Sequence, residues 1–135
     1  MTKTTIKTAL FAVFTAILLA SAVAPASADI KNYEFQLAKN EVKKGDGAIV
    51  DVRLMNTVTQ KPVSDAVIFA QRIDMAPDGM EMMASPIKLM PTTEPGLYRF
   101  ETSLSMEGRW RLSLSAKVQG EQGSVESQLV LKAVR

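Results

Sequence analysis

Methionine is concentrated in one short stretch of this 135-residue chain. Seven methionines follow residue 28, and five of them fall within residues 75–90. A core that needs apolar volume would normally use Leu, Ile or Val, whose rotamers are better defined, so the concentration is unusual as packing. A thioether sulfur is a soft, neutral ligand that selects Cu(I) and, by the same logic, Ag(I). The stretch therefore predicts a soft-metal site formed by Met75, Met80, Met82 and Met83.

The geometry of such a site depends on the turn at residues 77–79. Met80 and Met82 are two residues apart, so their side chains would point the same way on an extended segment. Met75 precedes the turn and could fold back towards them. The alternative interpretation is an adaptable apolar surface that contacts a partner protein without metal, with the sulfurs splayed outward or packed in the core.

The composition excludes several kinds of site. The chain has no cysteine and no histidine. Disulfides, thiolate and imidazole metal sites, and Ser-His-Asp or Cys-His catalytic groups are therefore absent. The carboxylates are scattered among turns and outward strand positions, so we expect no enzyme, and a carboxylate-only hydrolase is the alternative.

Residues 1–28 have the three-part pattern of a secretory signal peptide. Lys3 and Lys7 precede an apolar stretch at residues 9–20, and Ala26-Ser27-Ala28 ends the segment as a small-residue cleavage site. The apolar stretch is shorter than the roughly 20 residues that a membrane span needs. We therefore expect a periplasmic or, as the alternative, secreted protein with no stable membrane anchor after cleavage. An uncleaved anchor helix is the other interpretation.

Removal of the predicted signal peptide would change the net charge of the protein. Without Lys3 and Lys7, residues 29–135 hold 14 basic and 14 acidic side chains, so their net charge is zero. A neutral domain does not have the basic surface that nucleic-acid binding requires, and we expect no nucleic-acid partner.

The remainder of the chain alternates apolar and polar residues as half-buried strands do. Gly- and Pro-containing turns separate apolar faces at residues 33–37, 48–54, 66–73, 98–104, 110–118 and 125–133. This spacing predicts an all-β fold over residues 29–135, an immunoglobulin-like antiparallel β-sandwich, with a closed barrel as the alternative. Trp110 is in phase with Leu112 and Leu114, which predicts burial between the sheets rather than contact with a cation, and leaves Arg109 and Arg111 on the solvent side.

One segment breaks the alternation. Residues 75–91 contain three prolines and a glycine, so they cannot form one long regular strand. We expect a loop at residues 76–80, followed by a short irregular edge strand around residues 82–90.

Four short motifs then resemble a known family. Residues 62–67, the methionine segment 75–83, Pro95-Gly96-Leu97-Tyr98 and Met106-Glu107-Gly108-Arg109-Trp110 occur in the order seen in YtkA-like and FixH-like envelope domains. The resemblance covers about residues 46–133. It implies an immunoglobulin-like sandwich in the periplasm or on the cell surface. It also implies a role in handling copper or heavy metals, or in assembly of copper-containing oxidases, with the metal-binding methionines at 75, 80, 82 and 83.

Two functions follow from these observations. The first is an accessory protein that binds Cu(I) for resistance, buffering or delivery. The second is a non-catalytic interaction module that binds no metal and docks an envelope protein of an efflux or oxidase-assembly system.

Overall fold

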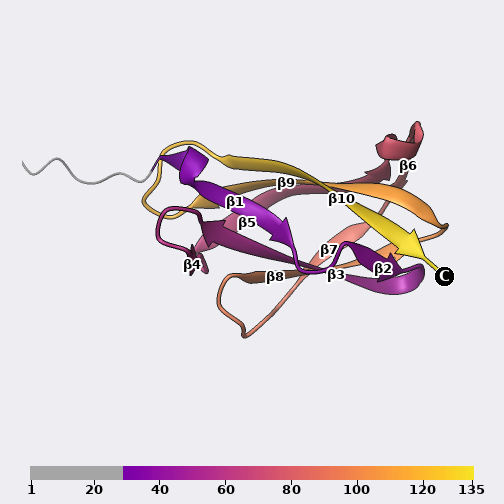
Figure 1. Cartoon of the computed structure of the whole chain (residues 1–135), viewed down its shortest axis with the longest axis horizontal. Helices are drawn as coiled ribbons and strands as arrows, with labels where there is room; N and C mark the ends of the chain where they lie inside the picture. The colour runs from indigo at the N-terminus through magenta and orange to yellow at the C-terminus, as the bar shows by residue number, and fades with distance from the viewer. Residues whose placement is uncertain (1–28) are drawn as a thin grey trace, which may run out of the picture.

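The computed structural model describes residues 29–135, and the predicted signal peptide, residues 1–28, lies outside the described residues. Two five-stranded sheets face one another as a sandwich (Figure 1). This confirms the predicted all-β, immunoglobulin-like architecture.

The first sheet has the strand order β1-β3-β8-β7, with β4 paired to the end of β3. All of its pairings are antiparallel. Its strands are β1 (Tyr33–Leu37), β3 (Gly45–Asn56), β4 (Lys61–Pro62), β7 (Ile87–Met90) and β8 (Leu97–Leu104).

The second sheet has the order β2-β10-β9-β5-β6. Its pairings are antiparallel except for β2, which runs parallel to β10. Its strands are β2 (Glu41–Lys43), β5 (Ala66–Met75), β6 (Met80–Ser85), β9 (Gly108–Val118) and β10 (Val125–Val134). Two short 3-10 helices, η1 (Ile30–Asn32) and η2 (Ala76–Asp78), precede β1 and β6.

The core lies between the sheets and follows the predicted alternation. On β9 the inward side chains, among them Trp110, Leu112 and Leu114, are buried, whereas the intervening residues are partly or fully exposed. Phe35 and Phe100 face them from the other sheet. The indole N–H of Trp110 donates to the Met106 carbonyl at 3.2 Å, so the buried ring leaves no polar atom unsatisfied.

The segment after β5 is more ordered than the sequence predicted. Instead of a loop at 76–80, the chain forms η2, and Gly79 ends it in the left-handed conformation with φ 76°. Instead of one edge strand at 82–90, there are two strands in different sheets. The chain leaves the second sheet after β6 and enters the first as β7, and the Thr102 hydroxyl donates to the carbonyl of the intervening Pro86 at 2.7 Å. Proline cannot continue a strand's hydrogen bonding, so it suits this change of sheet.

No helix within residues 29–135 has the length and apolar character needed to span a membrane.

Candidate metal site

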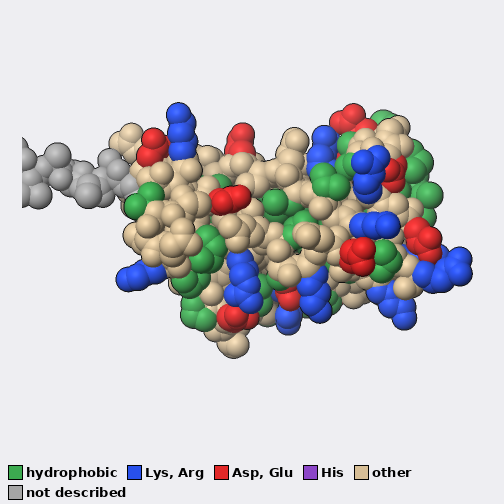
Figure 2. Space-filling view, viewed as in Figure 1, with side chains coloured by type: hydrophobic (Ala, Val, Ile, Leu, Met, Phe, Trp, Pro, Cys, Tyr) green, Lys and Arg blue, Asp and Glu red, His purple; other side chains and the backbone are tan. Residues whose placement is uncertain are grey.

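The predicted methionine ligands lie on one hairpin, formed by the end of β5, η2 and β6. This methionine hairpin (residues 74–85) stands at the end of the sandwich near the C-terminus, away from the end where residue 29 enters (Figure 1). In Figure 2 this end carries acidic and basic side chains side by side, with apolar side chains between them.

Met75 and Met80 are directly paired across the hairpin. The next pair, Asp74 with Ala84, follows after a shift in register. Residues 81–83 have no partner on β5, because two consecutive β5 residues pair with residues that are four apart on β6. Glu81, Met82 and Met83 thus form a wide bulge within β6, which we call the arch, and all three residues are exposed.

The four predicted ligands differ greatly in exposure. Met75 is fully buried in the core, Met80 is partly buried against it, and Met83 is 41% exposed. Met82 is 94% exposed at the arch. The hairpin thus places thioethers in order from the core to the solvent, within one short segment.

An ion pair attaches the hairpin to the start of β9. The Arg109 backbone N–H donates to Asp78 Oδ2 at 2.7 Å, and its Nε donates to Oδ1 at 2.8 Å. Arg109 Nη2 also donates to the Pro77 carbonyl at 2.7 Å. The hydrogen bonds from the Arg109 backbone and side chain lower the pKa of Asp78, outweighing the opposing effect of desolvation. Both carboxylate oxygens of Asp78 are thus used to attach the hairpin to β9.

A second attachment centres on Asp74, which is fully buried on the outer face of its sheet. Its Oδ2 accepts from Arg72 Nε at 3.0 Å and from Arg111 Nη2 at 3.1 Å. Its Oδ1 accepts the Ala76 N–H at 3.0 Å, which fixes the entry into η2. Burial alone would raise the pKa of Asp74, but the hydrogen bonds from Ala76, Arg111 and Arg72 outweigh it and the pKa is lowered.

The two arginines extend this network to the arch. Arg72 Nη2 donates to the Glu81 carbonyl at 3.2 Å, and Arg111 Nη2 lies 3.7 Å from Glu81 Oε1. The prediction that Arg111 is simply solvated is wrong, because its side chain is only 25% exposed and pairs with a buried carboxylate. Sequence reasoning missed Asp74. The available signal was Arg72 and Asp74 two apart on one strand face, with Arg111 placed similarly on β9.

Gly108 closes the base of the hairpin. A Cβ built on this residue would lie 2.6 Å from Asp78 Oδ2 and 2.7 Å from the Met75 Cε methyl group. A larger residue here would require Asp78 or Met75 to move, and the φ of 137° is also one that other residues rarely adopt. The turn before Gly108 holds Met106, which is 38% exposed, so a further thioether lies in the segment that packs against the hairpin base.

The donor chemistry at this end is that of sulfur. Within residues 29–135, no group of three or more His, Cys, Asp or Glu side chains is arranged to hold a metal ion. Of the hairpin carboxylates, Asp74 and Asp78 are paired with arginines, and Glu81 is 73% exposed with its Oε1 3.7 Å from Arg111. Thioether sulfur is a soft, neutral donor of the type that prefers Cu(I) or Ag(I) to hard divalent ions.

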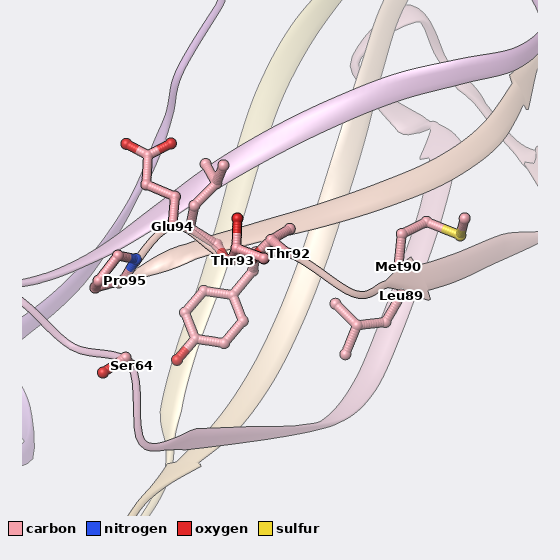
Figure 3. Close-up of a pocket in the computed structure, with 10 residues that line it drawn as sticks. Ser64, Leu89, Met90, Thr92, Thr93, Glu94 and Pro95 are labelled. Carbon is pink, nitrogen blue, oxygen red and sulfur yellow. Dashed lines mark hydrogen bonds between the residues drawn. The ribbon is translucent and has the colours of Figure 1, made fainter.

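A shallow cavity of about 340 Å³ lies elsewhere, beside the loop that joins β7 to β8 (Figure 3). Ser64, Leu89, Thr92 and Tyr98 are among its lining residues. The Tyr98 hydroxyl donates to the Val63 carbonyl at 2.9 Å, and the one carboxylate of the lining, Glu94, is paired with Arg53 at 2.9 Å. Tyr98 and Glu94 are therefore both engaged with other groups of the protein.

Comparisons with known proteins then place the chain in context. A family model described as YtkA-like matches residues 27–115. No curated protein matches. The solved structures that match include the following two, and both have TM-scores below 0.5. The "ZirS C-terminal Domain" has 12% identity and a TM-score of 0.46 over 100% of this chain and 88% of the other. The "Lin-41 filamin domain" has 17% identity and a TM-score of 0.43 over 77% and 93%.

Proposed function

The chain belongs to the YtkA-like family, and from this premise we propose that it is an exported, non-catalytic accessory protein that binds Cu(I) through the methionine hairpin. The observation that carries the proposal is the placement of Met75, Met80, Met82 and Met83 on one hairpin held by two arginine-carboxylate attachments. Copper is here the cargo rather than a resident cofactor.

The graded exposure of the four methionines suits capture and release. Met75 supplies the innermost thioether and Met80 the next, both fixed by packing against the core. Met82 and Met83 supply the outer thioethers on the arch, where an acceptor protein can approach the ion. A ligand set that is partly exposed allows the ion to pass by ligand exchange, which suits buffering or delivery.

Thioether ligation also suits an exported protein. A thioether needs no deprotonation before it binds metal, unlike a thiolate or imidazole, so capture persists in mild acid. It cannot be lost to disulfide formation in an oxidising compartment.

The test is a Cu(I) titration under reducing conditions against a competing chromophoric chelator. The protein is expressed from the full chain, and a Met80→Leu, Met82→Leu, Met83→Leu variant keeps the apolar volume while removing three sulfurs. A Met55→Leu, Met90→Leu variant, changed on strands of the other sheet, is the matched control. We expect one-to-one binding that the hairpin variant loses and the control retains. Wild-type protein that does not compete with the chelator would contradict the proposal.

The 94% exposure of Met82 favours a second candidate function. In this one the arch is an adaptable apolar contact for an envelope protein of an efflux or oxidase-assembly system, with no metal bound. It predicts that partner binding is lost in Met82→Glu, while Cu(I) competition is absent in both wild type and variant.

A further inference from the structure

One segment at the edge of the second sheet has no strand beside it. β5 pairs with β9 over residues 66–74, but with β6 only at residues 73–75. Residues 66–72 therefore have no second ladder partner within the described part of the chain. We call this segment the free β5 edge.

The free β5 edge differs from every other edge strand of the described sandwich. Exposed edges normally carry charged side chains, proline or very short strands, because these prevent pairing with another chain. Each of the remaining outer strands has a charge, namely Glu34 on β1, Glu41 and Lys43 on β2, Lys61 on β4, Glu81 on β6, and Lys88 on β7. The stretches of β3 and β10 that β1 and β2 leave uncovered also carry a charge, Asp46 and Glu126 respectively. Residues 66–71, by contrast, read Ala-Val-Ile-Phe-Ala-Gln, with no charge and no proline.

The outer face of this edge is apolar and open. Val67, which pairs regularly with β9, is 67% exposed, and Phe69, which lies at an irregularity of the same strand, is 59% exposed. A bulge between Ile68 and Ala70 shifts the register and is the one protective feature that this edge retains. Leu89, on β7 in the facing sheet, is also 39% exposed at the rim of the cavity in Figure 3. Strongly β-forming, uncharged segments of this length are the ones that pair with another strand.

The charges that flank the segment indicate which strand would pair with it. Asp65 precedes the uncharged run and is exposed, and Arg72 ends it with 54% of its side chain exposed. In an antiparallel pairing of two copies, Asp65 of one chain lies opposite Arg72 of the other, and the same pair forms again at the other end. The segment is thus self-complementary, as a two-fold interface requires. Residues 29–135 carry no net charge, so two copies do not repel each other.

We propose that the protein forms a homodimer in which two copies of the free β5 edge pair antiparallel, joining the two second sheets into one continuous sheet. In this register Val67 of each copy lies opposite Ala70 of the partner, and both side chains are on the outer face of the joined sheet. Because β5 leads directly into the methionine hairpin, an antiparallel pairing places the two hairpins at opposite ends of the joined sheet. The four methionines lie outside the dimer interface, which meets the methionine hairpin at Arg72, and the dimer stands whether or not copper binds.

The test measures oligomeric state by sedimentation velocity on protein expressed from the full chain, over a concentration range of about 1 to 300 µM. We expect a monomer–dimer equilibrium in the wild type. Val67→Lys places a charge on the free β5 edge and should raise the dimer dissociation constant at least about tenfold, because an edge lysine blocks strand pairing. Val58→Lys is the matched control, since Val58 is 70% exposed in the β3–β4 turn, outside any strand, and should leave the constant unchanged.

Two further measurements locate the interface. Asp65→Lys should weaken the dimer by setting like charges opposite one another at both ends, with circular dichroism and thermal melting confirming that each variant folds. Amide hydrogen exchange of residues 67–71 should slow as the protein concentration rises. A wild type that stays monomeric throughout, a dimer that Val67→Lys does not weaken, or concentration-dependent protection confined to other segments would each overturn the proposal. If the protein is monomeric at every concentration, the strand that pairs with the free β5 edge would have to come from a different protein.

Discussion

Arg109 holds Asp78 with both its backbone and its side chain, through hydrogen bonds of 2.7 and 2.8 Å. The two residues are 31 positions apart in the sequence, and their contact attaches the 3-10 turn of the methionine hairpin to the first residues of β9. The 3-10 turn is thereby fixed at both ends, by Asp78 here and by Asp74 at the end of β5.

The buried carboxylate of Asp74 should matter more for stability than any exposed acid. Asp74→Asn leaves two arginines with a neutral partner, and we expect it to lower the free energy of unfolding by about 2–3 kcal/mol. Glu94→Gln is the control, because Glu94 is 52% exposed in its pair with Arg53 and such pairs contribute about 1 kcal/mol or less. Urea denaturation measures both. Equal, small losses would show that the Asp74 network is not a stabilising attachment.

The two hairpin carboxylates also predict how stability depends on pH. Asp74 and Asp78 both have a pKa lowered from the ordinary value of 3.8, so the folded state favours their ionised forms. Their contribution is fully present above that value and is lost as the pH falls through the lower pKa of the folded state. We expect wild-type stability to fall below about pH 4, and an Asp74→Asn, Asp78→Asn variant to be less stable near neutrality with a flatter acid limb. Denaturation curves between about pH 2 and 7 test this, and a double variant that is as steep in acid as the wild type would contradict it.

The close approach at Gly108 gives a sharper mutational test. Gly108→Ala inserts a methyl group against Asp78 and Met75 and should cost about 1–3 kcal/mol beyond any backbone strain. Gly45→Ala isolates that strain, because Gly45 has nearly the same φ, 136° against 137°, and nothing within 4 Å of its built Cβ. The difference between the two variants in thermal or urea unfolding measures the contact. If the two variants lose the same free energy of unfolding, Asp78 and Met75 can move aside without a measurable loss of stability, and the contact contributes nothing.

Met75 and Met82 should differ in how much each contributes to the stability of the fold. Met75→Ala removes a fully buried side chain and should destabilise the protein by about 2–5 kcal/mol. Met82→Ala, at a side chain that is 94% exposed, should change stability by less than about 0.5 kcal/mol while weakening Cu(I) binding. Unfolding and chelator competition on the same samples test both. Cu(I) affinity that is unchanged in Met82→Ala would remove the arch from the ligand set.

Metal selectivity and pH provide an independent check on thioether ligation. We expect Ag(I) to displace Cu(I) from the wild type, and Zn(II) to leave it bound, because thioethers select soft ions. The Cu(I) affinity should be the same at pH 7 and pH 5, since no ligand has to lose a proton. Chelator competition at both pH values measures this. An affinity that falls tenfold or more towards pH 5 would show that binding requires a group to lose a proton in this range, which would contradict ligation by thioethers alone.

Much of this molecule follows from its sequence. Alternation with period two located the main strands and assigned Trp110 to the core, because in a strand the face of each side chain is set by local geometry alone. Composition alone excluded thiolate and imidazole chemistry and left methionine as the one soft donor. The match of the YtkA-like model confirms the resemblance that the short motifs suggested.

Other features depend on which strands meet. The change of sheet between β6 and β7, the arch at residues 81–83 and the complete burial of Met75 all depend on pairing register, which local alternation does not contain. Asp74 reads as an outward strand residue, yet it is buried because β9 brings Arg111 beside it. The free β5 edge exists because β6 is too short to cover β5. Each of these features is determined by a strand or side chain that is distant in the sequence, so only the tertiary structure shows it.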